Sequence, residues 1–190
     1  MRQTVHVFAR APRLGTVKRR LAAGIGAVAA LRFYRASLAA TLRRLATDRR
    51  FRTVLAITPN GARGPWRHGL PVVGQGRGDL GQRMHRAARR HSRGRVAIVG
   101  ADIPDLRADD VAAAFRRLRA ADACFGPAED GGYWLVALGA RRPARPFADV
   151  RWSGPRALTD TLANFRGQRV AFVRTLRDVD TAADLKKPPR

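Results

Sequence analysis

Two kinds of apolar pattern alternate along this chain, and the alternation limits the folds that it can adopt. Short apolar runs, as in strands, occupy residues 5–8, 53–57, 71–73, 96–99, 123–125, 133–138 and 170–173. Apolar residues spaced three or four apart, as in helices, occupy residues 17–23, 27–45, 84–90, 111–118 and 158–165. This order predicts an α/β sandwich of three layers with a mostly parallel central sheet.

The length of the chain and the segments that it lacks narrow the class of protein further. A chain of 190 residues can bury one sizeable core, so we expect one domain over residues 1–185 and a frayed basic tail over residues 186–190. No uncharged apolar run approaches the roughly 20 residues of a membrane helix, and residues 1–10 lack the apolar core of a signal peptide. The one cysteine, Cys124, gives no internal disulfide. We therefore expect a cytoplasmic protein with no membrane segment.

Charge is distributed unevenly along this basic protein. The formal net charge is +24. Residues 1–95 contain 22 basic and two acidic side chains, whereas residues 96–190 contain 16 basic and 12 acidic ones. The first half therefore favours an anionic partner, either a phosphate-bearing ligand or a nucleic acid, and the second half holds most carboxylates available for a metal or for proton transfer.

The loop that follows the first predicted strand is rich in cations. Ligands of parallel α/β sheets bind beyond the carboxyl ends of the strands, and a helix N-terminus there favours anions. Residues 10–21 hold five cations at such a position. Lys18, assisted by Arg10 and Arg20, would offset the charge of a nucleotide's phosphates, and Thr16 could cap the helix that follows. The alternative is a basic surface turn, since the spacing of a Walker A loop is absent.

A glycine-rich loop follows the third predicted strand. Residues 76–81 spell G-x-G-x-x-G, and Asp102 lies 21 residues further on, which formally satisfies the dinucleotide pattern. Because two other strands come before the strand that leads into this loop, we prefer a loop that closely approaches the base and ribose of a nucleotide, with Asp79 as a hydrogen-bond acceptor. The alternative is a turn in which Asp79 only caps the next helix.

Carboxylates follow two later strands and the last one. Asp102 comes directly after an apolar strand, and a carboxylate there suits Mg²⁺, which takes one or two carboxylates together with phosphate oxygens and water. Asp105 could support Asp102 or cap the next helix. Asp130 could act as a metal ligand or a base in a pocket walled by Tyr133 or Trp134, unless the Asp-Gly-Gly segment is an ordinary turn. Asp180 could complete the metal site or cap a short helix.

Four segments, in this order, resemble a known family. They span Phe8–Leu21 (F-x-R-x-P-x-x-G-x-V-K-x-R-L), Gln75–Met84 (Q-G-x-G-D-L-G-x-R-M), Gly100–Leu106 (G-x-D-x-P-D-L) and Gly126–Tyr133 (G-P-x-x-D-G-G-Y). Together they look like the glycosyltransferase A-like (GT-A) bacterial transferases of the selenodomain-associated type. The resemblance covers nearly the whole chain and implies the fold of the nucleotide-diphospho-sugar transferases, which include nucleotidylyltransferases.

The resemblance also implies roles for two residues. In such relatives the first loop and its lysine hold phosphates, and the aspartate after the central strand holds a divalent metal, which maps onto Lys18 and Asp102. The chain departs from the family at Arg19, where the family usually has threonine. It also has Gly-Ala-Asp at residues 100–102 instead of the D-x-D signature of many sugar transferases.

These observations predict a transferase that depends on Mg²⁺ or Mn²⁺ and moves a nucleotidylyl group from a nucleoside triphosphate to a small phosphorylated acceptor. Glycosyl transfer from a nucleotide sugar is the alternative within this class, and a non-catalytic nucleic-acid- or nucleotide-binding domain is the alternative outside it. The predicted site consists of catalytic residues Lys18, Asp102 and Asp130; nucleotide-binding residues Arg10, Pro12, Gly15, Lys18, Arg20, Gly76, Gly78, Asp79 and Leu80; acceptor-binding residues Gly131, Gly132 and Tyr133; and metal ligands Asp102 and Asp180.

Overall fold

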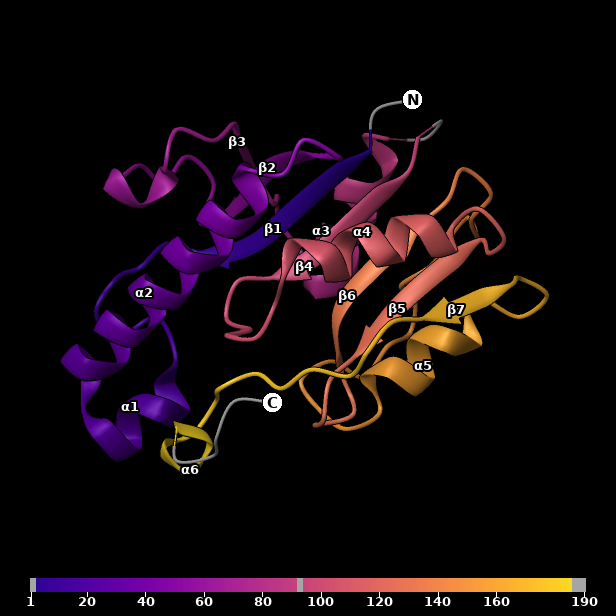
Figure 1. Ribbon diagram of the computed structural model, residues 1–190. Coiled ribbons are helices and arrows are strands. Elements are labelled where there is room, and N and C mark those ends of the chain that lie inside the picture. The colour runs from indigo at the N-terminus through magenta and orange to yellow at the C-terminus, as the bar shows by residue number, and fades with distance from the viewer. Residues whose placement is uncertain (1–2, 92–93, 186–190) are drawn as a thin grey trace.

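A seven-stranded sheet forms the centre of the molecule (Figure 1). The computed structural model describes residues 3–91 and 94–185, so the tail predicted at residues 186–190 lies outside the described part. The strands are β1 (Thr4–Arg10), β2 (Arg52–Thr58), β3 (Val72–Gly74), β4 (Val96–Gly100), β5 (Ala123–Pro127), β6 (Tyr133–Leu138) and β7 (Val170–Phe172). Their order across the sheet is β3-β2-β1-β4-β6-β5-β7.

The sheet is mostly parallel, as the sequence predicts. β1 pairs in parallel with β2 and β4, β2 with β3, and β5 with β7, whereas β6 is antiparallel to both β4 and β5. In the central pair, Val7 of β1 lies opposite Val99 of β4. The carboxyl ends of β1 and β4 therefore meet at one edge of the sheet. The loop that contains Lys18 follows β1 there, and Asp102 follows β4.

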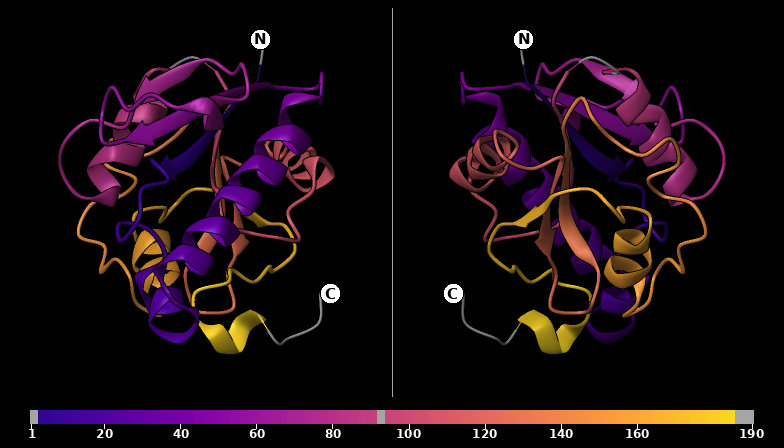
Figure 2. Two further views of the ribbon diagram at one scale, coloured as in Figure 1. Left: turned by 90° about the vertical axis from the view of Figure 1, so that its left-hand side faces the viewer. Right: turned by 90° about the vertical axis from the view of Figure 1, so that its right-hand side faces the viewer.

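Helices cover both faces of the sheet (Figure 2). They are α1 (Arg19–Ile25), α2 (Ala27–Ala46), α3 (Leu80–Arg89), α4 (Ala108–Arg117), α5 (Ala157–Ala163) and α6 (Ala182–Leu185), with the 3-10 turn η1 (Pro65–Arg67). α2 and α4 pack on one face, and α3 and α5 pack on the other. Since side chains alternate along a strand, Val7 of β1 faces α2 and α4 while Phe8 faces α3. Among the described helices, none has both the length and the apolar character needed to cross a membrane.

The start of α1 differs from the prediction. Thr16 does not cap it: its hydroxyl donates to the carbonyl of Arg13, and the helix begins at Arg19. Lys18 takes the N-cap position in the left-handed conformation, with φ 48° and ψ 49°. The cap prediction is wrong because the left-handed backbone of Lys18 delays the helix by two residues. Asp105 likewise does not cap α4, whose N-cap is Arg107.

A buried histidine, His6, is paired with the half-buried His91, and we expect it to make stability depend on pH. His6 of β1 is 2% exposed, and its Nε2 lies 2.9 Å from His91 Nε2. Burial, with smaller contributions from His91 and Arg90, lowers the pKa of His6 from 6.5 to about 4. Since unfolded His6 binds a proton more readily, its contribution to stability is complete above pH 6.5 and is lost as the pH falls towards 4.

We expect the free energy of unfolding to fall by up to about 3 kcal/mol between pH 7.5 and pH 4 because of the lowered pKa of His6. Urea unfolding at the two pH values measures the loss. The H6L variant should lose distinctly less over the same interval, because leucine is apolar and does not titrate. An H6L protein with the pH dependence of the wild type would rule out His6 as the source.

Candidate active site

A polar cavity of about 540 Å³ opens at the carboxyl ends of β1 and β4. It is lined by Phe8, Arg10, Thr16, Val17, Lys18, Arg19, Arg20, Tyr34, Ala101, Asp102, Ser153 and Asp180. Four of these side chains are cationic and two are carboxylates. We call this space the charged cavity; residues from both ends of the chain form it.

Lys18 connects the two ends of the chain. Its Nζ lies 2.6 Å from Asp102 Oδ2 and 2.7 Å from Asp180 Oδ1, and the side chain is 5% exposed. Burial opposes its charge, but Asp102 and Asp180 outweigh that effect and raise the pKa of Lys18. The left-handed backbone at Lys18, a conformation that non-glycine residues rarely adopt, turns the chain at this point. Lys18 is therefore charged and held between two carboxylates from distant segments.

Asp178 belongs to the same group of acidic residues. Burial, followed by the negative charges of Asp180, Asp130 and Asp102, raises the pKa of Asp178 from 3.8 to about 6. The positive charge of Lys18 acts in the opposite direction and lowers the pKa of Asp178. A site with this much negative charge is stabilised by a bound cation.

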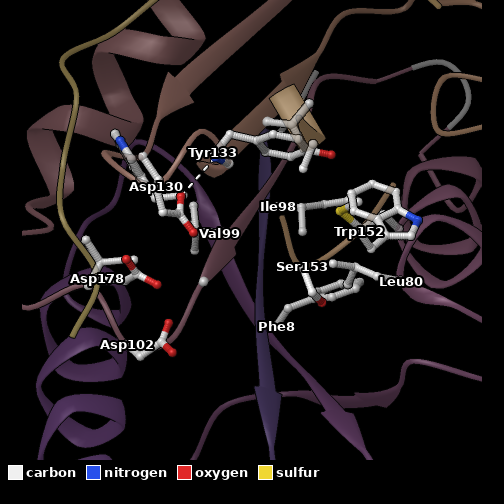
Figure 3. A pocket seen from close by; sticks show the side chains of 18 of the residues that line it. Phe8, Leu80, Ile98, Val99, Asp102, Asp130, Tyr133, Trp152, Ser153 and Asp178 are labelled. Atoms are coloured by element: carbon white, nitrogen blue, oxygen red, sulfur yellow. Dashed lines mark hydrogen bonds between the residues drawn. The ribbon is translucent and has the colours of Figure 1, made fainter. Parts of the chain in front are cut away.

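A second, smaller cavity adjoins the first (Figure 3). Its volume is about 260 Å³, and it shares Phe8, Asp102 and Ser153 with the charged cavity. Asp102, Asp130 and Asp178 lie along one side of it, and Phe8, Leu80, Ile98 and Trp152 lie along the other. We call this space the apolar cavity. Because Asp102 borders both spaces, ligands in the two cavities would meet beside its carboxylate.

The turn between β5 and β6 positions Asp130. The backbone N–H of Gly132 donates to Asp130 Oδ1 over 2.9 Å, which orients the carboxylate towards the apolar cavity. Gly131 has φ +84°, and a Cβ at this position would overlap the backbone carbonyl of Pro155. The turn is therefore packed tightly against the segment before α5.

Replacing Gly131 by alanine tests this packing. Gly167 serves as the control, since it has φ +77° and nothing within 4 Å of an added Cβ. We expect G167A to lower the unfolding free energy by about 1 kcal/mol, the cost of the left-handed backbone. G131A should lose at least about 1 kcal/mol more because of the overlap. Urea unfolding of both variants measures the difference, and equal losses would contradict the close packing.

The structure brings together many of the predicted site residues. Arg10, Lys18, Arg20, Asp102 and Asp180 line the charged cavity. The apolar cavity is lined by Asp102, Asp130 and three others that the sequence analysis also selected: Leu80, Gly132 and Tyr133. Neither cavity is lined by the remaining ones, which are Pro12, Gly15, Gly76, Gly78, Asp79 and Gly131.

The glycine-rich loop has a structural arrangement of its own. Asp79 Oδ1 accepts the N–H of Gln82, and the Gln82 side chain accepts the N–H of Asp79, so Asp79 caps α3 as the alternative interpretation proposed. The buried Gln75 donates to the carbonyls of Ala9 and Ala56 and thereby ties this loop to β1 and β2. A nucleotide contact by this loop remains a prediction.

Trp152, Ser153 and Asp178 are among the lining residues that the sequence did not indicate. Trp152 and Ser153 follow no predicted strand, and Asp178 was passed over in favour of Asp180 two residues later. Trp134, which was considered for the pocket wall together with Tyr133, lines the apolar cavity too, and its indole also packs into the core on the α2 and α4 face and donates to the carbonyl of Arg174. Because side chains alternate along a strand, Tyr133 and Trp134 of β6 face opposite sides of the sheet.

The donor set fits a divalent cation that prefers oxygen. Asp102 and Asp180 offer carboxylates that are 30% and 42% exposed, and Lys18 occupies the space between them. Within residues 3–91 and 94–185, no three His, Cys, Asp or Glu side chains form a complete metal site. Mg²⁺ or Mn²⁺ would therefore need oxygens from a ligand, as Mg²⁺ bound beside phosphates normally has.

Comparison with known families places residues 41–154 in a family described as "Uncharacterized protein conserved in bacteria (DUF2064)". Comparison with curated proteins gave no match. Among solved structures, a provisionally described nucleotide-diphospho-sugar transferase from Desulfovibrio desulfuricans G20 matches 97% of this chain and 85% of its own length. Its sequence identity is 29% and its TM-score is 0.88.

Two more distant structures share the fold. One is 4-diphosphocytidyl-2C-methyl-D-erythritol synthase from Anaerococcus prevotii, with 11% identity, a TM-score of 0.60 and coverage of 97% of this chain and 94% of that one. The other is glucosyl-3-phosphoglycerate synthase from Mycobacterium tuberculosis, solved with Mn²⁺ and UDP, with 11% identity, a TM-score of 0.58 and coverage of 93% and 70%. These likenesses confirm the predicted GT-A (nucleotide-diphospho-sugar transferase) fold.

Proposed function

This chain belongs to the bacterial family DUF2064, and we propose that it is a transferase that moves a nucleotidylyl group from a nucleoside triphosphate to a small-molecule acceptor. The observation that carries the proposal is the charged cavity, where Arg10, Arg19 and Arg20 line the same space as the bridge that Lys18 forms with Asp102 and Asp180. Such a set can offset the charge of three phosphates while carboxylates hold a cation beside them.

The residues of the charged cavity would have different roles in the reaction. Lys18 would exchange its carboxylate partners for phosphate oxygens, with Arg10 and Arg20 as further donors. Asp102 and Asp180 would hold a divalent cation, which when bound would neutralise charge that develops on the phosphates. Phosphoryl chemistry of this type depends on positioning and charge compensation more than on covalent participation by the protein.

The acceptor would react at the boundary of the two cavities. Its hydroxyl oxygen forms a bond to the α-phosphorus, the bond from that phosphorus to the bridging oxygen breaks, and pyrophosphate leaves. Asp130, whose carboxylate faces the apolar cavity, would accept the hydroxyl proton. The side chains that bind the donor and the acceptor would thus come from opposite sides of Asp102.

Glycosyl transfer is the second candidate, favoured by the likeness to the Desulfovibrio protein. In that reaction the acceptor would attack the anomeric carbon of a nucleotide sugar and release a nucleoside diphosphate. The four cationic side chains of the charged cavity favour the triphosphate, because it carries more negative charge than the diphosphate of a nucleotide sugar.

Calorimetric titration with nucleoside triphosphates and nucleotide sugars, each with and without Mg²⁺ or Mn²⁺, tests the proposal. We expect a triphosphate to bind at least tenfold more tightly with the cation. Cation-dependent binding of nucleotide sugars alone would replace the proposal by glycosyl transfer. Binding of neither class, or binding that is indifferent to the cation, would overturn it.

A further inference from the structure

The two cavities differ in the charge of the side chains that line them. The charged cavity has four cationic side chains in its lining. Among the described residues that line the apolar cavity, none is Lys, Arg or His, and the charged ones are the carboxylates Asp102, Asp130 and Asp178. The remaining side chains there are largely apolar or aromatic: Phe8, Leu80, Met84, Ile98, Tyr133, Val136 and Trp152.

From this division we infer that the acceptor is an alcohol with an apolar ring or aliphatic body and no phosphate group. The inference rests on the proposed function, since it names the class of molecule that would receive the transferred group. It replaces the phosphorylated acceptor expected from the sequence, which the lining of the apolar cavity does not support.

Size and shape favour an apolar body of one or two rings. The cavity measures about 260 Å³, and an apolar protein cavity of roughly 150 Å³ binds benzene. The ring of Trp152 packs edge-on against that of Tyr133, with centroids 6.4 Å apart and an angle of 67° between the planes. Gly81 in the first turn of α3 lets Trp152 approach closely, because a Cβ there would come within 2.9 Å of its indole. Trp152 therefore forms a fixed apolar wall.

Charge excludes a phosphate from this space. A phosphate in the apolar cavity would lie beside the three carboxylates that line one side (Figure 3). The cation next to that lining, Lys18, is already paired with Asp102 and Asp180. A neutral hydroxyl meets no such repulsion and can donate to a carboxylate there. Since Asp102 borders both cavities, an alcohol held with its hydroxyl on the carboxylate side points that oxygen towards the donor's phosphates.

The test compares 2-phenylethanol with 2-phenylethyl phosphate, two probes that differ only in the phosphate. Binding is measured by ligand-observed NMR on the wild type, on W152A and on the control W66A. The control removes a half-buried tryptophan of η1 that lines neither cavity. We expect 2-phenylethanol to bind the wild type and W66A alike and to lose at least fivefold in affinity in W152A.

The phosphorylated probe should show no affinity that depends on Trp152. Affinity for 2-phenylethyl phosphate that falls in W152A as much as that for the alcohol would overturn the inference, as would an alcohol that W152A binds as well as the wild type does. In D130N, whose altered side chain is exposed, the phosphorylated probe should gain affinity for the apolar cavity, seen as competition with 2-phenylethanol that the wild type does not show. Unchanged binding in D130N would show that charge does not select the acceptor.

The measurement uses no nucleotide and no metal, so the two proposals can fail separately. A preference for the alcohol that depends on Trp152, in a protein that binds no nucleotide, would refute nucleotidylyl transfer and leave the apolar cavity as an alcohol site. A nucleotide-binding protein that prefers the phosphorylated probe in this cavity would overturn the inference and leave the proposed function standing.

Discussion

The K18M variant is expected to bind a nucleoside triphosphate at least tenfold more weakly than the wild type. Lys18 is charged and nearly buried between Asp102 and Asp180, where it can reach a ligand in the charged cavity. Loss of one hydrogen bond from a charged donor to phosphate costs about 2 kcal/mol. Calorimetric titration with the triphosphate and Mg²⁺ measures the change.

K18M should also change metal binding in the opposite direction. Without the ammonium group between them, Asp102 and Asp180 repel each other and attract a divalent cation more strongly. Mn²⁺ alone, measured by electron paramagnetic resonance, should therefore bind more tightly to K18M than to the wild type. R13M is the matched control, because it removes one charge from the same loop at an exposed residue that lines neither cavity. Equal losses of triphosphate affinity in K18M and R13M would show that Lys18 acts only through the overall charge of the protein.

The D102N variant is expected to lose the dependence of triphosphate binding on the cation. Asparagine keeps the size of the side chain but removes the anionic oxygen that Mg²⁺ or Mn²⁺ requires. The wild type should gain at least tenfold in affinity on addition of the cation, and D102N should gain less than twofold. Lys18 retains Asp180 as a partner, so the fold should persist.

D109N is the control for this experiment. Asp109 lies at the start of α4, its exposed side chain pairs with Arg50, and it lines neither cavity. It should show the same gain from the cation as the wild type does. A D102N protein that gains as much as D109N would remove Asp102 from the metal site.

The sequence predicted the sheet well because each strand has its own local signal. The apolar run at residues 96–99 lacks polar alternation, and β4 is buried on both faces. The meeting of Lys18 with Asp102, 84 residues apart, also follows from the pattern, because both lie in the loops that follow parallel strands. β1 and β4 are neighbours in the sheet, and their carboxyl ends share one edge.

The residues that sequence analysis missed depend on packing that no local pattern describes. Trp152 lies in an irregular segment before α5, and its place is set by contact with Gly81 of α3 and Tyr133 of β6. Asp178 becomes notable only through burial beside carboxylates from other loops. The predicted cap at Thr16 is wrong for a similar reason. Lys18 lies where local rules place the first turn of the helix, but it has a left-handed backbone and forms ion pairs with two distant carboxylates.

The central claim is that cationic residues from the first half of the chain and carboxylates from the second half hold one nucleotide and one cation in the charged cavity. A crystal structure of the protein with a nucleoside triphosphate and Mn²⁺, with data collected at the manganese absorption edge, tests it most directly. We expect an anomalous peak in contact with Asp102 and a phosphate of the same nucleotide in contact with Lys18. A manganese peak or phosphates bound away from both residues would contradict it.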